Sequence, residues 1–190
     1  MEAAMLLYVN ACVRKDSRTK LLADYLISHF DEEISEIRLG DIQFPVTDEE
    51  FLRKRDHLIM NRRFDDEIFK YARLFAVADA IVIAAPFWDL SFPSSLKHFF
   101  ENINVIGLTF EYNEKGVPVG LCKANKLYYV TTAGGTIFNE EYGFGYVKAL
   151  AQSFYGINDC KLIKAENLDI IGSDVTAILS AAKAEIDSLF

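Results

Sequence analysis

Cysteine and histidine are scarce, and neither is spaced as a metal site or a disulfide framework requires. The three cysteines, Cys12, Cys122 and Cys160, are spread over most of the chain and form no CxxC pair. The three histidines, at positions 29, 57 and 98, share no ligand-like spacing with one another or with a cysteine. Zinc sites and disulfide-rich domains both show such spacing in their sequences. We therefore expect neither a bound metal nor a disulfide.

The chain also lacks an excess of positive charge and any long apolar run. It has 28 acidic and 20 basic residues, a formal net charge of −8 and an isoelectric point near 4.9. Such a surface is ill suited to neutralising a phosphate backbone, which argues against nucleic acid as a partner. The apolar runs are short and interrupted by charge, far from the roughly 20 residues that span a bilayer. With no secretory signal visible at the N-terminus, we expect a cytoplasmic protein that does not insert into membranes.

Proline and glycine are sparse as well, at 4 and 10 of 190 residues, and no linker, repeat or low-complexity tract is visible. Hydrophobic residues make up 51% of the chain, enough to fill one core, so residues 1–190 are expected to form a single domain. Aromatic residues are plentiful by contrast, because 15 Phe, 9 Tyr and one Trp make 13% of the chain. We expect some of these rings to face a ligand or a partner subunit.

Apolar runs alternate with amphipathic stretches along the chain. Strands are expected at residues 5–9, 34–39, 80–85, 126–132 and 160–165. Helices are expected from Thr19, from a capping box at 47–50, from Asp65 or Asp66, from Ser94 or Ser95, around 147–154 and from Ser173. Residues 107–123 resemble an extended excursion with a turn at 113–116. The alternation is typical of a doubly wound α/β fold, in which a parallel sheet carries helices on both faces.

In such a sheet the ligand binds in a crevice at the carboxyl ends of the strands, where the strand order reverses. Three loops that follow expected strands are unusual enough to contribute to this crevice: residues 10–19, 86–93 and 132–135. Each of them has both a functional and a purely structural interpretation.

The first loop leads into a helix through Ser17, Arg18 and Thr19. Free backbone N–H groups, two hydroxyls and a guanidinium would meet there, which is a suitable environment for a phosphate. The structural alternative is that Ser17 or Thr19 only caps the helix and that Arg18 is a solvated surface residue.

The same loop matches the Cys-x5-Arg-Ser/Thr signature of low-molecular-weight tyrosine phosphatases, with Cys12 as nucleophile and Arg18 as phosphate ligand. Against this alternative, residues 13–17 contain no Gly or Asn for the positive φ angles of a tight phosphate cradle. Asp16 would also repel a phosphate, and the chain has no Asp-Pro pair to resemble that family's general acid. Cys12 is otherwise expected to be a small buried side chain at the end of a strand.

The second loop places three aromatic rings, Phe87, Trp88 and Phe92, between Pro86 and Pro93. A flat ring system would fit against them, and the prolines would reduce the cost of ordering the loop. The alternative is that these rings cover the core or a dimer contact.

The third loop, Thr132-Ala133-Gly134-Gly135, has few side chains where the chain leaves the fourth strand. Its two glycines permit close approach of the backbone to a ligand. The alternative is a tight turn with no functional role.

Taken together, these segments resemble the FMN-dependent NADH:quinone oxidoreductases and azoreductases of the flavodoxin-like fold, over essentially the whole chain. Ser17, Arg18 and Thr19 fall where that family binds the FMN phosphate. Residues 87–90 (Phe-Trp-Asp-Leu) fall where the family has a Met-Tyr-Asn-Phe-like stretch around the isoalloxazine ring. Residues 132–135 match its Ser-Arg-Gly-Gly-like stretch, and residues 107–112 (Gly-Leu-Thr-Phe-Glu-Tyr) are similar to its Gly-x-Thr-Phe-x-Tyr segment.

The resemblance implies a five-stranded parallel sheet in the order 2-1-3-4-5, bound FMN, and NADH or NADPH as electron donor. It implies a quinone or an azo compound as acceptor in a ping-pong hydride mechanism, and a homodimer with the site at the interface. No side chain is assigned as a catalytic acid or base, because the flavin carries the chemistry. The residues implied to bind the cofactor are Ser17, Arg18, Thr19, Pro86, Phe87, Trp88, Asp89, Leu90, Thr132, Ala133, Gly134 and Gly135.

Three positions depart from the family pattern: Ala11 replaces a serine, Asp89 an amide and Ala133 an arginine. Asp89 matters most, since a carboxylate cannot donate a hydrogen bond and adds negative charge near the flavin. A flavodoxin-type electron carrier, which would bind FMN but pass single electrons to protein partners, is the main alternative function.

Overall fold

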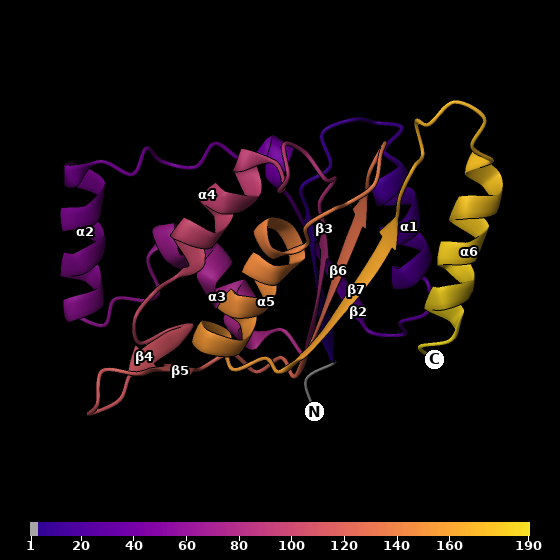
Figure 1. Ribbon diagram of the computed structural model, residues 1–190. Helices are drawn as coiled ribbons and strands as arrows, with labels where there is room; N and C mark the ends of the chain where they lie inside the picture. Colours follow the sequence, from indigo (N-terminus) through magenta and orange to yellow (C-terminus); the bar gives the residue numbers. More distant parts are fainter. Residues whose placement is uncertain (1–3) are drawn as a thin grey trace.

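A five-stranded parallel sheet runs through the computed structural model, which describes residues 4–190 (Figure 1). Its strands are hydrogen-bonded in the order β2-β1-β3-β6-β7. Counted along the sheet's own strands, this is the order 2-1-3-4-5 that the family resemblance implies. The strands are β1 (Met5–Asn10), β2 (Glu33–Arg38), β3 (Ala80–Ala84), β6 (Lys126–Thr132) and β7 (Asp159–Ala165).

Helices cover both faces of the sheet, as predicted. One face packs against α1 (Arg18–Ile27) and α6 (Val175–Asp187), and the other against α3 (Lys70–Val77), α4 (Ser94–Ile103) and α5 (Tyr146–Leu150) (Figure 1). Alternate side chains of β1 point to opposite faces, so that Leu6 and Tyr8 join one core while Leu7 and Val9 join the other. The unbroken apolar runs of the central strands follow from burial on both sides.

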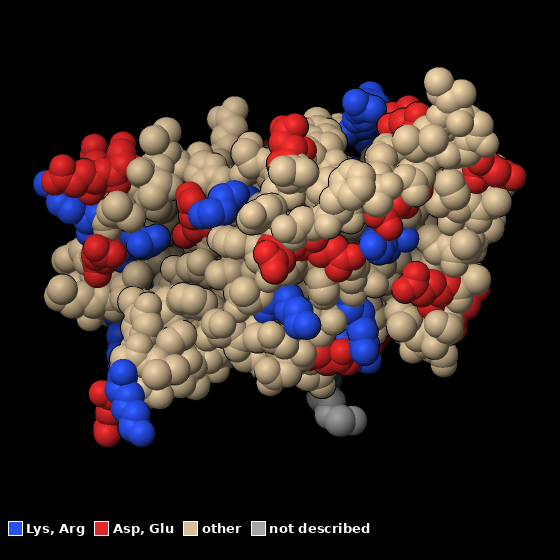
Figure 2. Space-filling view, viewed as in Figure 1, with Lys and Arg blue, Asp and Glu red and all other residues tan. Residues whose placement is uncertain are grey.

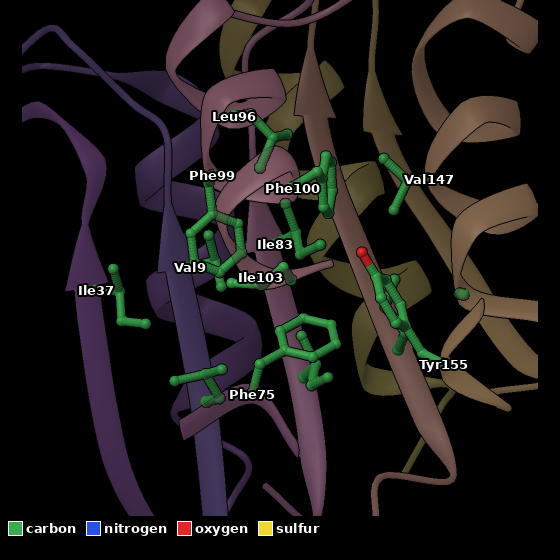
Figure 3. Close-up of a cluster of buried hydrophobic side chains, with 14 of the residues drawn as sticks. Val9, Ile37, Phe75, Ile83, Leu96, Phe99, Phe100, Ile103, Val147 and Tyr155 are labelled. Carbon is green, nitrogen blue, oxygen red and sulfur yellow. The ribbon is translucent and has the colours of Figure 1, made fainter. Parts of the chain in front are cut away.

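Aromatic rings fill much of the larger core (Figure 3). The Phe99 ring of α4 lies 6.2 Å from the Phe75 ring of α3 and 5.9 Å from the Phe100 ring, and the Phe75 ring meets the Tyr155 ring edge-on at 4.7 Å between centroids. The Tyr155 hydroxyl donates a 2.6 Å hydrogen bond to Asn104 Oδ1. A large part of the aromatic surplus in the sequence therefore packs the core and does not face a ligand.

The helix predicted from the capping box stands apart from the other helices (Figure 1). α2 (Glu49–Met60) begins after Asp48, whose carboxylate accepts a 2.8 Å hydrogen bond from the amide of Phe51. Its apolar face, Phe51, Leu52, Leu58 and Ile59, is only half-buried, and no α2 residue is fully buried. The helix forms from its own capping and periodicity, with weaker support from packing.

The predicted excursion between α4 and β6 is a hairpin of β4 (Phe110–Tyr112) and β5 (Pro118–Gly120). Asn113 Oδ1 accepts hydrogen bonds from the amides of Lys115 and Val117, and Gly116 has a φ of +73°. A Cβ atom at Gly120 would lie 2.1 Å from the backbone nitrogen of Gly156. A side chain at position 120 would therefore prevent the hairpin from packing this closely against the chain at Gly156.

Two predicted helix boundaries need correction. The helix expected around 147–154 is regular only in α5, because residues 141–145 and 151–155 on either side form wider π-helical turns. The last helix is capped by Asp174, not by Ser173, since the Asp174 carboxylate accepts the amide of Ala177. Over residues 4–190, no helix is long and apolar enough to cross a membrane.

Candidate functional site

A cavity of about 300 Å³ opens at the carboxyl ends of the strands, beside the point between β1 and β3 where the strand order reverses. This volume lies at the lower end of the range of about 300–1,000 Å³ that small-molecule sites occupy. All three predicted loops contribute to it. The predicted residues that line it are Ser17, Arg18, Thr19, Pro86, Phe87, Trp88, Thr132, Ala133 and Gly134.

Backbone hydrogen bonds hold the loops in place by continuing the sheet beyond its strands. The amide of Ala11 donates to the Ala84 carbonyl at 2.8 Å, and the amide of Phe87 donates to Thr132 at 3.0 Å. The amide of Ala133 likewise donates to the Ala165 carbonyl at 2.9 Å. The walls of the cavity therefore begin as hydrogen-bonded extensions of the sheet.

The start of α1 forms one wall. Ser17 is its N-cap, with the hydroxyl oxygen accepting a 3.2 Å hydrogen bond from the amide of Lys20. The hydroxyls of Thr19 and Thr132 lie 2.6 Å apart and are buried, which ties the helix start to the end of β6. Ser17 thus has the capping role that the sequence left open, and both Ser17 and Thr19 also line the cavity.

Arg18 does not point freely into solvent. Its Nη1 donates to Asp169 Oδ1 at 2.7 Å and to the carbonyl oxygen of Leu168 at 3.3 Å. The Arg18 side chain is 40% exposed and that of Asp169 is 70% exposed. The interpretation of Arg18 as a merely solvated residue is therefore wrong, and a fourth loop, after β7, completes the site.

Sequence reasoning missed five residues of the cavity. Leu168 and Asp169 lie in that fourth loop, and its composition gave no signal beyond its position after a sheet strand. The chain turns there at Asn167, which has a φ of +64°. The remaining three, Val13, Arg14 and Asp16, lie in the first loop beside the predicted residues.

Gly134 and Asp169 lie in close contact. A Cβ atom at Gly134 would be 2.3 Å from Asp169 Oδ2, so the bare backbone at this position accommodates the carboxylate. The amide of Asp169 donates to the Gly134 carbonyl at 2.9 Å, which fixes the two loops together. Gly135 does not line the cavity and has open space where its Cβ would be, so steric crowding does not explain the second glycine.

The second loop folds into a two-residue hairpin at the mouth of the cavity. Trp88 and Ser91 exchange backbone hydrogen bonds of 3.1 and 2.8 Å. Between them, Asp89 and Leu90 have φ values of +49° and +68°, the combination that a type I′ turn requires. Neither lines the cavity, and a non-glycine residue in this region carries a strain of about 1–2 kcal/mol. Backbone strain of this kind clusters at functional sites.

The charges around the cavity balance. Arg14, Arg18, Asp16 and Asp169 all line it, and acidic and basic side chains are interspersed over the molecular face in Figure 2. The N-terminus of α1 adds partial positive charge to one wall. This donor set fits an anionic group at one end of the cavity, with Phe87 and Trp88 available to a planar ring at the other.

Comparison with known proteins decides the family. A family model described as flavodoxin-like fold matches residues 4–190. An FMN-dependent NADH:quinone oxidoreductase of Lachnoclostridium phytofermentans is 36% identical over 186 residues, 93% of each chain. Another, of Coprothermobacter proteolyticus, is 34% identical over an alignment of 198 positions that covers 98% of each chain. The chain belongs to the FMN-dependent NADH:quinone oxidoreductase family.

More distant solved structures share the fold. An azoreductase from Bacillus anthracis superimposes on this family member with a TM-score of 0.85, at 20% identity over 98% of each chain. An FMN-dependent NADH-azoreductase from the same organism, solved in complex with FMN, has a TM-score of 0.80 at 23% identity over 97% of each chain. The whole described chain therefore follows one known architecture.

Cys12 of this family member is not prepared for nucleophilic chemistry. Burial raises the pKa of its thiol above the ordinary value, an effect only partly offset by a hydrogen bond with Ser17. Its Sγ lies 3.9 Å from the carbonyl oxygen of Ala84, and Cys12 is not among the residues that line the cavity. The structure thus gives no support to the phosphatase alternative, which needs a thiolate facing the anion.

Phe92 corrects one expectation for the second loop. Its ring packs against Phe100 and Tyr146, with centroid distances of 6.2 and 5.7 Å, and does not line the cavity. Of the three rings in this loop, Phe92 covers the core while Phe87 and Trp88 face the cavity.

Proposed function

We propose that this chain binds FMN in the cavity and transfers electrons from NADH or NADPH to a quinone or an azo compound. One observation carries the proposal: a single cavity at the strand reversal joins a cationic helix start, two aromatic rings and a bare glycine backbone. The names of the family relatives, FMN-dependent NADH:quinone oxidoreductase, support the same reaction.

Each wall of the cavity is assigned a part of the cofactor. Ser17, Arg18 and Thr19 would hold the phosphate with the α1 N-terminus, because helix N-termini and arginine both bind anions. Pro86, Phe87 and Trp88 would contact the ring system, and the strained turn at Asp89 and Leu90 would shape the rim with its backbone amides. The backbone of Thr132, Ala133 and Gly134 would border the ring from the β6 side.

Bound FMN supplies the two-electron redox chemistry, and the protein supplies placement and electrostatics. Phe87 and Trp88 offer flat apolar surfaces that would orient the ring and exclude water from one side. Arg18 would neutralise part of the phosphate charge. We assign no side chain as a catalytic acid or base.

An absorbance spectrum of the purified protein, before and after incubation with FMN, tests the cofactor. A yellow protein, or a colourless one that becomes yellow on reconstitution, is expected. A protein that takes up no FMN would contradict the proposal.

NADH oxidation in the presence of menadione tests the reaction. Turnover is expected, whereas a flavodoxin-type carrier would bind FMN but show almost no turnover. Hydrolysis of p-nitrophenyl phosphate that is lost in Cys12→Ala would instead favour the phosphatase alternative.

Replacing the arginine tests the phosphate assignment. Arg18→Ala is expected to lower FMN affinity about tenfold to a hundredfold, since a charge-assisted hydrogen bond contributes about 1.5–3 kcal/mol. Arg63→Ala is a suitable control, because Arg63 forms an exposed ion pair with Asp65 and does not line the cavity. Unchanged FMN retention in Arg18→Ala would refute the assignment.

We also propose a homodimer, formed by a single cytoplasmic domain that spans residues 1–190. The half-buried α2 and the exposed side chains of Val46, Met60 and Phe138 support an apolar contact between copies. The five-stranded sheet and the cores on its two faces run through the described chain, which supports a single domain. The three free cysteines agree with the reducing environment of the cytoplasm. Sedimentation that gives a monomer at micromolar concentration would contradict the dimer.

A further inference from the structure

We propose that Asp169 is a specificity-determining residue that competes with the ligand's phosphate for Arg18, and so limits how strongly the site prefers a phosphorylated flavin. The inference rests on the proposed function, because it concerns the phosphate end of the same cavity. Asp169 was not expected from the sequence, and its side chain reaches the cavity only because the loop after β7 turns back over β6.

The carboxylate of Asp169 lies between two parts of the site. Oδ1 accepts the 2.7 Å hydrogen bond from Arg18 Nη1, while Oδ2 lies against the backbone of Gly134. Its position is set by the main chain, since the amides of Leu168 and Asp169 donate to the carbonyls of Ala133 and Gly134 at 3.2 and 2.9 Å. A ligand that extends from Gly134 to the start of α1 therefore passes this carboxylate.

Arg18 cannot give its full hydrogen-bonding capacity to a phosphate while this pair is formed. Nη1 already donates to Asp169 and to the carbonyl oxygen of Leu168, so only the other N–H groups of the guanidinium are available to a phosphate. Because the pair is exposed, its strength is low, and a phosphate can displace Asp169. The displaced or shared carboxylate still lies next to the phosphate and repels it.

The charge balance of the cavity supports the same inference. Two arginines, Arg14 and Arg18, and two aspartates, Asp16 and Asp169, line the cavity, so the formal charges of these four side chains cancel. A bound phosphate makes it negative, in a protein whose net charge is already −8. Removal of the Asp169 charge alone would leave a net positive site for the same phosphate.

The experiment compares FMN with riboflavin, which has the same ring and sugar alcohol but no phosphate. Dissociation constants for both are measured by flavin fluorescence titration, for the wild type and Asp169→Asn at low and moderate salt. We expect Asp169→Asn to tighten FMN binding about threefold to fivefold, in line with the strength of an exposed charge pair, and to change riboflavin binding less than twofold. The gain should shrink as salt screens the charges.

Asp16→Asn is the matched control, because it removes the same charge from the same cavity but Asp16 forms no ion pair with Arg18 in residues 4–190. The decisive measurement is a double-mutant cycle with Arg18→Ala. If Asp169 acts by engaging Arg18, the gain from Asp169→Asn should be smaller in the Arg18→Ala background, where only the repulsion between the carboxylate and the phosphate remains, whereas the effect of Asp16→Asn should be unchanged. Asp169→Ser, which also removes the carboxylate, replaces Asp169→Asn if that variant folds poorly.

Three results would overturn the proposal. These are an unchanged or weaker FMN affinity in Asp169→Asn, an equal gain for riboflavin, or a gain of the same size in the Arg18→Ala background. A wild-type protein that binds neither FMN nor riboflavin would be a different result, because it would refute the proposed function itself.

Discussion

Relieving the strained turn at the mouth of the cavity should stabilise the protein. Leu90 has a φ of +68°, which costs a branched L-residue about 1–2 kcal/mol, whereas glycine adopts this conformation freely. Glycine also makes the unfolded chain more flexible, a loss of about 0.5–1 kcal/mol. Leu90→Gly is therefore expected to be more stable than Leu90→Ala by about 0.5–1 kcal/mol.

The comparison with Leu90→Ala isolates the backbone term, because both variants remove a side chain that is 56% exposed and contributes little packing. Gly116→Ala gives the opposite sign at a second turn. Gly116 has a φ of +73° and no atom near its missing Cβ, so strain alone should make this variant less stable by about 1 kcal/mol.

Urea unfolding gives the free energies, and calorimetry should show a Tm about 2 °C higher for Leu90→Gly than for Leu90→Ala. If Leu90→Gly were instead the less stable of the two by about 0.5–1 kcal/mol, the cost of glycine at an unstrained position, then the turn would not be strained in solution. FMN titration of both variants then shows whether the rigid turn also contributes to binding.

Three further results are expected. Thr19→Val should cost about 1–3 kcal/mol in urea unfolding, because it leaves the buried Thr132 hydroxyl without its 2.6 Å partner, and adding Thr132→Val should recover part of that loss. Burial raises the pKa of Cys122 to about 12, from 9.0. Below pH 9 the thiol is neutral in both the folded and the unfolded state, so its contribution to stability is fully present there. Between pH 9 and 12 the unfolded chain loses this proton while the folded chain keeps it, and the free energy of unfolding falls by about 1.4 kcal/mol per pH unit. In thermal unfolding, the Tm of Cys122→Ala should therefore decline less steeply with alkaline pH than the Tm of the wild type. Cys12 should react slowly with iodoacetamide at pH 7 because partial burial raises the pKa of its thiol too, and rapid alkylation would contradict this raised pKa.

The sheet and most of its helices were predictable because their signals are local. The strand expected at 126–132 coincides with β6, and its apolar centre at 127–130 reflects a strand that is buried on both faces and tolerates few polar side chains. The Asp48 cap and the Asn113 turn are likewise encoded within a few residues of where they act.

The rest of the site depends on where loops travel after they leave the sheet. Phe87 and Phe92 are both aromatic and five positions apart, but only the turn between them decides that one lines the cavity while the other packs on Phe100. Asp169 reaches Arg18 across 151 positions of sequence through a turn at Asn167. The periodicity of α2 predicts its apolar face, but it does not reveal how little of that face the chain itself covers.

The cavity is assembled from four separate connections, one from each of the strands β1, β3, β6 and β7. A substitution of a lining side chain that makes no contact with the other connections therefore alters a single wall and leaves the sheet beneath it in place. Such a site can change its preferred ligand in small independent steps, without a loss of folding at each step. Asp169 illustrates this, because its connection brings a negative charge to the cavity from a loop other than the three that the sequence indicated.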